Sequence, residues 1–113
     1  MTGEPAELDP MATGDSLLAA LAAIANPQRL RILGALAGGS NYVSQLAREL
    51  RISRPLLYLH LQRLEAVGLV KGHLELSDEG KAMKFFEVVP FQMHLDPDSI
   101  REAVKTLTLG EQD

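Results

Sequence analysis

The segment VSQLARELRISRPLLYLHLQRLEAVGLV, residues 43–70, decides the fold of this chain. Its first part has apolar residues at the i, i+3, i+4, i+7 spacing of one helix face: Val43, Leu46, Ala47 and Leu50. A second helix is predicted after Ser53, a suitable N-cap, because Pro55 then falls in the first turn, where a missing N–H is harmless. Its core stripe consists of Leu57, Leu61 and Leu64. Gly68 ends it, so the segment predicts a helix-turn-helix.

Upstream of this segment, the sequence predicts a tail and two helices. Residues 1–14 contain Pro, Gly and acidic residues without periodicity, which is typical of a disordered acidic tail. The stretch 16–25 is apolar on every side, so a helix there needs cover on more than one face, and we expect a second subunit to supply it. Asn26 and Pro27 suit the N-cap and first position of a helix that runs to about Ala37. Its expected inward residues are Leu30, Leu33 and either Gly34 or Leu36.

Downstream of the segment, the pattern changes from helical to extended. The runs 69–76 and 81–89 are rich in β-forming residues and flank the turn sequence SDEG, which predicts a β-hairpin. Asp96 and Pro97 again suit an N-cap and a first helical position. The final helix presents one apolar face, made of Ile100, Ala103, Val104 and Leu107. The expected fold class is therefore mainly α with a small β-hairpin (α+β), a winged helix-turn-helix with extra N- and C-terminal dimerisation helices.

Length and composition set the domain organisation. The 113 residues suffice for one domain, expected over residues 15–109, with a short tail at 110–113. The apolar run 17–25 is about half of what a membrane span needs, and the acidic start differs from a secretory signal. The absence of cysteine excludes disulfides and thiolate metal sites and fits a reducing compartment. We therefore expect a cytoplasmic protein that has no membrane partner.

The basic residues are unevenly distributed, although the net charge is −4. Residues 1–26 carry four acidic residues and no Lys or Arg, and residues 85–113 carry six acidic residues against two basic ones. Residues 27–84 carry nine Lys or Arg against five acidic residues. Since phosphate binding needs a local basic face and not a basic protein, this distribution favours a nucleic-acid surface on the central part.

Several stretches, in this order, carry a family resemblance. They are ANPQRLRIL (25–33), VSQLARELRIS (43–53), Pro55, His60-Leu61 and LEAVGLV (64–70). Over about residues 16–107 the chain resembles the ArsR/SmtB family of small winged-helix repressors. The resemblance implies a homodimer that pairs through its first and last helices. It also implies that an effector releases the protein from its operator or, in some cases, strengthens operator binding. His60 matches a histidine common in the family, and its expected role is a structural hydrogen bond beside the core.

We expect the second helix of the motif to enter the major groove of double-stranded DNA. Arg54 suits guanine or a phosphate, Gln62 suits adenine, and Leu59 suits a thymine methyl group. On the hairpin, Lys81 and Lys84 are expected to contact phosphates, whereas the acidic tip stays clear of DNA. The full set of expected DNA-binding residues is Ser44, Gln45, Ser53, Arg54, Tyr58, Leu59, Gln62, Arg63, Lys81 and Lys84.

The expected dimer interface joins the apolar residues of the first and last helices. It consists of Leu17, Leu18, Leu21, Ile24, Ile100, Val104 and Leu107. The sequence thus favours a homodimeric, sequence-specific transcriptional repressor that binds an inverted-repeat operator. No motif for catalysis or a phosphate-binding loop is present, so we expect no enzymatic activity.

Two alternatives remain open at this point. His94, Asp96 and Asp98 have the ligand chemistry for Ni or Zn, although the expected roles are an N-cap for Asp96 and a surface position for His94, and no cofactor is expected. Relatives in the family usually have small or polar residues where this chain has Leu56, Tyr58 and Leu59. That apolar face of helix 53–67 could instead meet a partner protein.

Overall fold

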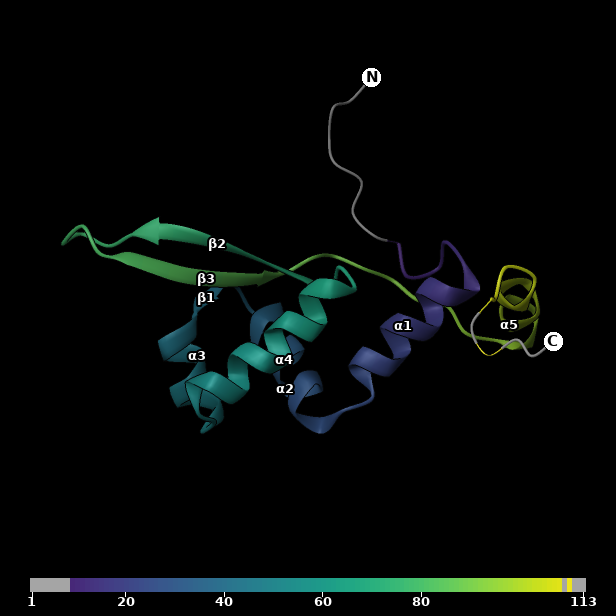
Figure 1. Ribbon diagram of the computed structural model, residues 1–113, viewed down its shortest axis with the longest axis horizontal. Coiled ribbons are helices and arrows are strands. Elements are labelled where there is room, and N and C mark those ends of the chain that lie inside the picture. The colour runs from purple at the N-terminus through teal and green to yellow at the C-terminus, as the bar shows by residue number, and fades with distance from the viewer. Residues whose placement is uncertain (1–8, 109, 111–113) are drawn as a thin grey trace, which may run out of the picture.

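The computed structural model describes residues 9–108 and 110. Within them the elements follow in the order α1 (Gly14–Ile24), α2 (Pro27–Ala37), β1 (Asn41–Tyr42), α3 (Val43–Leu50), α4 (Arg54–Ala66), β2 (Val70–Leu76), β3 (Ala82–Val88) and α5 (Pro97–Val104) (Figure 1). The helices α3 and α4 form the predicted helix-turn-helix, and β2 and β3 form the predicted hairpin. The predicted fold class is confirmed.

Side-chain caps fix the beginnings of the helices where the sequence placed them. The carboxamide of Asn26 accepts from the N–H of Arg29, and the hydroxyl of Ser53 accepts from the N–H of Leu56, at 3.0 and 3.3 Å. Asp96 caps α5 in the same way. These caps satisfy N–H groups that have no partner inside the helix, which is why the helices begin at these positions.

The predicted tail of residues 1–14 extends too far toward the first helix. Residues 1–8 lie outside the described residues, but Thr13 and Ser16 form a reciprocal capping box that starts α1 at Gly14. Pro10 is buried, so the turn before the helix belongs to the domain. At the other end, the structure describes only Gly110 of the predicted tail 110–113.

The sheet has one more strand than the sequence predicted. Its order is β1-β3-β2, with both pairs antiparallel, and Asn41 pairs with Phe86. Two residues between a Gly-Gly-Ser turn and a helix carry no alternation, so β1 could not be recognised from sequence. Gly72 lies opposite Phe86, and a Cβ at Gly72 would lie 2.8 Å from that ring, so the two strands need a glycine here.

The core lies between α2, α3, α4 and the inner half of the hairpin. Leu57, Leu61 and Leu64 are fully buried in it, as the stripe on α4 predicted. The prediction for Leu30 was wrong, because this side chain is 57% exposed. Ile32, Leu33 and Leu36 form the buried face of α2, and at about 100° per residue Leu30 lies on the far side from Ile32.

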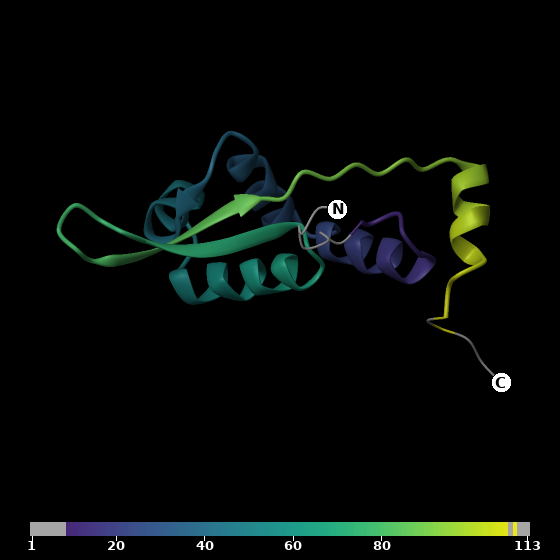
Figure 2. The ribbon, with the colours of Figure 1, turned by 90° about the horizontal axis from the view of Figure 1, so that it is seen from above.

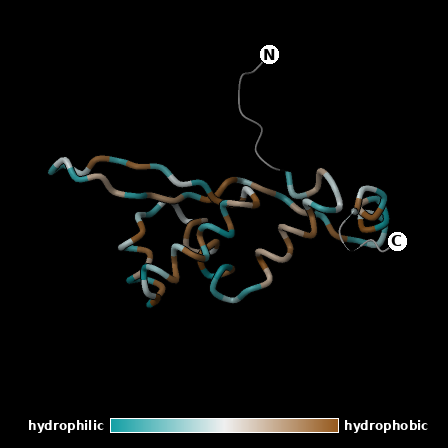
Figure 3. The backbone as a smooth tube through the Cα atoms, viewed as in Figure 1, coloured by the Kyte–Doolittle hydropathy of each residue, from teal (hydrophilic) through white to brown (hydrophobic). Residues whose placement is uncertain are grey.

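The molecule is elongated, with extents of 55 × 39 × 27 Å. The hairpin turn forms one end, and α1 and α5 form the other, with an extended segment leading from β3 to α5 (Figure 2). Figure 3 shows a largely hydrophobic α1 and a hydrophilic hairpin tip. A hydrophilic region and a hydrophobic region therefore lie at opposite ends of the molecule.

Candidate nucleic-acid interface

A cavity of about 420 Å³ opens between the start of α3, the start of α4 and the hairpin. Its lining residues are Tyr42, Val43, Ser44, Arg54, Tyr58, Lys81, Ala82, Met83 and Lys84. Half of the predicted DNA-binding residues meet here, although they come from three separate parts of the chain. The fold thus gathers two lysines, an arginine and three side chains with hydroxyl groups on one concave surface, and no acidic side chain lines it.

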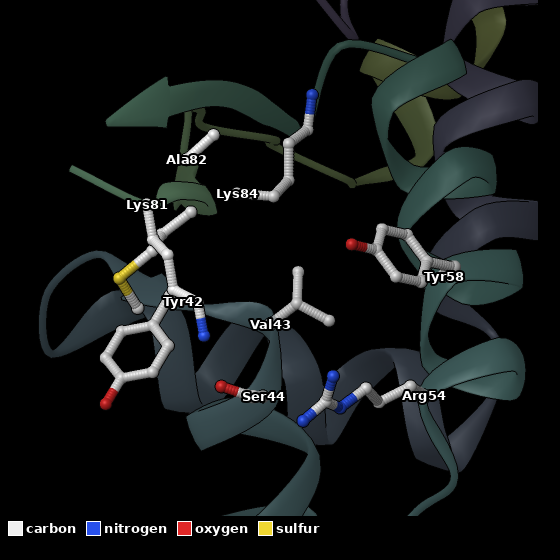
Figure 4. A pocket seen from close by; sticks show the side chains of 9 residues that line it. Tyr42, Val43, Ser44, Arg54, Tyr58, Lys81, Ala82 and Lys84 are labelled. Atoms are coloured by element: carbon white, nitrogen blue, oxygen red, sulfur yellow. The ribbon is translucent and has the colours of Figure 1, made fainter. Parts of the chain in front are cut away.

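The polar groups in this cavity do not all point the same way. Figure 4 shows the guanidinium of Arg54, the hydroxyl groups of Ser44 and Tyr58 and the amine of Lys81 around the same space. Hydrogen-bond donors arranged in this way suit the oxygens of a phosphate. The amine of Lys84 points away from them in this view and lies 5.5 Å from the centre of the Phe86 ring.

The outer face of α4 carries the residues expected at base edges. Leu59 is 47% exposed, and Gln62 and Arg63 are exposed with it. The hydroxyl of Ser53 serves as the cap of α4. Gln45 lies outside the cavity, where its carboxamide bonds with Arg48 and Glu49 on α3. The structure therefore divides the predicted residues into three groups: those that line the cavity, those on the outer face of α4, and Ser53 and Gln45, whose side chains bond within the motif itself.

The hairpin tip has the geometry of a tight turn with exposed acidic residues. The N–H of Ser77 donates to the carbonyl of Lys81 at 2.8 Å, and Asp78 and Glu79 are exposed. The sequence predicted Leu74 and Leu76 as alternating strand residues and gave them no functional role, and their side chains are exposed on the same side of the hairpin as Lys84. Their alternation with His73 and Glu75 was visible, but the sequence could not tell which face would extend beyond the core.

A second, apolar cleft lies between α1 and α5. It has a volume of about 230 Å³ and is lined by Gly14, Leu17, Leu18, Leu21, Leu95, Ile100, Ala103, Val104 and Leu107. Six of the seven predicted interface residues line it, and Leu107 does so from the turn that follows α5. Ile24 lies elsewhere, packed against the main core.

Hydrogen bonds between backbone N–H groups and side chains hold α1 and the segment after α5 together. The N–H of Gly14 donates to the hydroxyl of Thr106 at 2.8 Å, and the N–H of Thr108 donates to the carboxylate of Asp15 at 2.7 Å. A Cβ on Gly14 would collide with the carbonyl oxygen of Ala103. The two hydrogen bonds join residues 92 and 93 positions apart, so no local pattern in the sequence could reveal them.

The metal candidates are only partly brought together. The ring of His94 lies 2.8 Å from the carboxylate of Asp96, and Asp98 instead lies 3.8 Å from Arg101. In the described part of the chain, no group of three His, Asp or Glu side chains could hold a metal ion. The hydrogen bonds from Ser99 and His94 lower the pKa of Asp96, as its role as an N-cap requires. A membrane span is equally absent from residues 9–108, since none of their helices is long and apolar enough.

These features define a winged helix-turn-helix domain with a basic cavity between the recognition helix and the wing. A family model described as bacterial regulatory protein, arsR family, matches residues 26–71. An uncharacterized HTH-type transcriptional regulator of Methanocaldococcus jannaschii is 34% identical over 80 residues, which are 71% of this chain and 83% of that protein. The chain belongs to the ArsR family of transcriptional regulators, which are not enzymes.

Solved structures share the same fold. The homodimeric winged helix-turn-helix DNA-binding domain Mb0332 of Mycobacterium bovis superposes with a TM-score of 0.61 at 24% identity, over 93% of this chain and 85% of that one. NolR from Sinorhizobium fredii superposes with a TM-score of 0.57 at 26% identity, over 80% of this chain and 79% of that one. The winged helix-turn-helix predicted from the sequence is thus the fold of known regulators.

Proposed function

We propose that this regulator is a homodimeric repressor that binds an inverted-repeat operator in a sequence-specific manner. The observation that carries the proposal is the cavity between α3, α4 and the wing, where Ser44, Arg54, Tyr58 and Lys81 surround one space. A DNA strand whose phosphate enters this space would be held from both the helix-turn-helix and the wing. The start of α4 would then lie in the adjacent major groove.

Specificity is assigned to the outer face of α4. Gln62 can form two hydrogen bonds with the edge of adenine, and Leu59 can pack on a thymine methyl group. Lys84 and Arg63 supply further positive charge at the edges of the contact. Two acidic residues at the wing tip, Asp78 and Glu79, would be repelled by a minor groove, so the wing is expected to contact the backbone from its strands.

The proposed dimer places the cleft between α1 and α5 at the interface. Leu18, Ile100 and Val104 are 46%, 49% and 57% exposed in the single chain, and together with Leu95 they form a continuous apolar surface. A twofold axis through this surface would present two copies of α4 to DNA. The homodimeric domain from Mycobacterium bovis, which has the same fold, supports this assembly.

Selection of bound duplexes from a random pool tests the proposal. We expect inverted half-sites whose centres lie about 10–10.5 base pairs apart or a multiple of that spacing, as two recognition helices on one face of DNA require. Gln62→Ala should relax the preference at one symmetric pair of positions and should cost about 1–3 kcal/mol of discrimination there. Recovery of random duplexes without an inverted repeat would refute a sequence-specific dimer.

A second candidate function rests on the apolar part of α4. Leu56 and Leu59 are 42% and 47% exposed, and Tyr58 lies between them in the sequence. Such side chains could bind an apolar groove on a partner protein. Binding that survives a rise from 50 to about 200 mM salt would favour the partner protein, because a protein with several phosphate contacts loses much of its DNA affinity over that range.

A further inference from the structure

Arg29 connects three helices. Its Nε donates to the backbone carbonyl of Ala23 at the end of α1, at 2.6 Å. Its Nη1 lies 3.3 Å from Nδ1 of His60 in the middle of α4, and its own N–H is capped by Asn26 at the start of α2. One side chain therefore joins the helix proposed for dimerisation to the helix proposed to read DNA.

The contact with His60 requires a particular form of the imidazole. A guanidinium N–H can only donate, so Nδ1 of His60 must accept, and the proton of the neutral ring must reside on Nε2. The imidazolium ion has protons on both nitrogens and would turn an N–H toward Arg29. Protonation would therefore replace a hydrogen bond between α2 and α4 by a contact between two cations.

The surroundings of His60 favour the neutral ring. Partial burial and the positive charges of Arg29 on α2 and Arg63 on α4 lower its pKa below the usual value of 6.5. Of the other elements that pack against α4, the C-terminal half of α1 carries no ionisable side chain, whereas α3 carries Arg48 and Glu49 and β2 carries Lys71, His73 and Glu75. Among the described residues, Glu49 is bonded to Gln45 and Glu75 to His73, and no ion pair joins either carboxylate to His60.

We propose that Arg29 is a positioning residue for the recognition helix α4 and that it acts through His60 only while the imidazole is neutral. Mild acidification therefore weakens the binding of this protein to DNA. The proposal rests on the proposed binding of α4 to DNA. The direction is opposite to the ordinary effect of acid on a DNA-binding protein. Positive charge gained in acid would by itself strengthen binding to phosphates.

Imidazole NMR of the free protein tests the link without DNA. We expect His60 to have its neutral proton on Nε2 and to titrate below 6.5. We expect Arg29→Lys to move the titration of His60. Lysine keeps the charge but loses the planar fork that reaches Ala23 and His60 together. A proton on Nδ1, or a titration of His60 at or above 6.5, would overturn the proposal.

Duplex affinity from pH 7.5 down to one pH unit below the midpoint measured for His60, at constant ionic strength, tests the consequence. We expect the wild-type affinity to fall, for each pH unit below the midpoint measured for His60, by up to about tenfold per protomer, or about a hundredfold for the dimer. His60→Asn keeps an acceptor oxygen near the place of Nδ1 but takes up no proton, so its affinity should no longer fall in acid. His94→Asn is the matched control and should behave like the wild type, and circular dichroism at each pH shows whether the fold is intact.

The outcomes separate this inference from the proposed function. Wild-type binding that rises or stays constant over the pH unit below the midpoint measured for His60, or an equal acid response in His60→Asn, would overturn the switch while leaving DNA binding in place. Failure of the wild type to bind any duplex at either pH would overturn the proposed function, and the switch on DNA with it. If His60→Asn does not fold, the wild-type pH profile and the NMR titration of His60 still test whether a neutral His60 is required for binding.

Discussion

Ile100→Glu tests the proposed dimer most sharply. Ile100 lines the apolar cleft and is 49% exposed in the single chain, so glutamate is tolerated there as long as the protein is a monomer. Burying the exposed half of an isoleucine contributes about 1 kcal/mol, and an unpaired carboxylate in the same place costs several kcal/mol. A twofold interface contains the change twice, so we expect a loss of at least about 4 kcal/mol, or about a thousandfold in the dimer dissociation constant.

Sedimentation equilibrium over a range of concentrations measures this change. The wild type should be a dimer at micromolar concentration, and Ile100→Glu should be a folded monomer with unchanged circular dichroism. Leu30→Glu is the matched control, because Leu30 is 57% exposed on α2 and lies outside the cleft. A wild type that stays monomeric at high concentration, or an Ile100→Glu variant that remains dimeric, would show that the cleft between α1 and α5 is not the interface.

Three further predictions concern stability and effectors. Gly14→Ala should destabilise the fold by about 1–3 kcal/mol in thermal unfolding, because the added Cβ would collide with the carbonyl of Ala103. Gly34→Ala is the control: it has open space around it and should stabilise the fold by up to about 1 kcal/mol. Equal effects of the two substitutions would contradict the close packing of α1 on α5. Asp96→Ala should lower the free energy of unfolding at pH 7, because it removes the carboxylate that caps α5. The difference from the wild type should shrink as the pH falls through the lowered pKa of Asp96, since the charged cap stabilises only above that range; a difference that does not depend on pH would argue against a charged cap. Thiol oxidants should leave duplex affinity unchanged, because the chain has no cysteine. Zn²⁺ and Ni²⁺ should also leave it unchanged, because Asp98 pairs with Arg101 instead of joining His94 and Asp96. A metal response that His94→Ala abolishes would contradict this expectation.

The parts of the fold that follow from local rules were predictable. Asn26, Ser53 and Asp96 begin their helices as expected, because an N-cap is recognised from its own side chain and the residues that follow it. The core stripe of α4 was predictable from helical periodicity alone. Leu30 was assigned to the wrong face because α2 has leucines and an isoleucine on more than one side, and periodicity could not decide which of them would be buried.

The geometry of the sites depended on contacts between distant residues. Sequence reasoning named Ser44, Arg54 and Lys81 separately, but only the fold shows that they line one cavity. Gly14 was placed in a tail, although its missing side chain allows α1 to approach α5. The bridge from Arg29 to His60 spans 31 positions, and neither side chain carries a local signal for the other.

The central claim is that the cavity between α3, α4 and the wing holds the DNA backbone. The most direct measurement is the salt dependence of duplex affinity for Arg54→Ala and Lys81→Ala, with Lys105→Ala as the control, because Lys105 pairs with Glu102 on the distant α5. We predict that each cavity variant reduces the slope of log K against log salt by about one unit per lost phosphate contact, or about two per dimer. Lys105→Ala should leave the slope unchanged. Unchanged slopes in both cavity variants, or an equal reduction in Lys105→Ala, would contradict the claim.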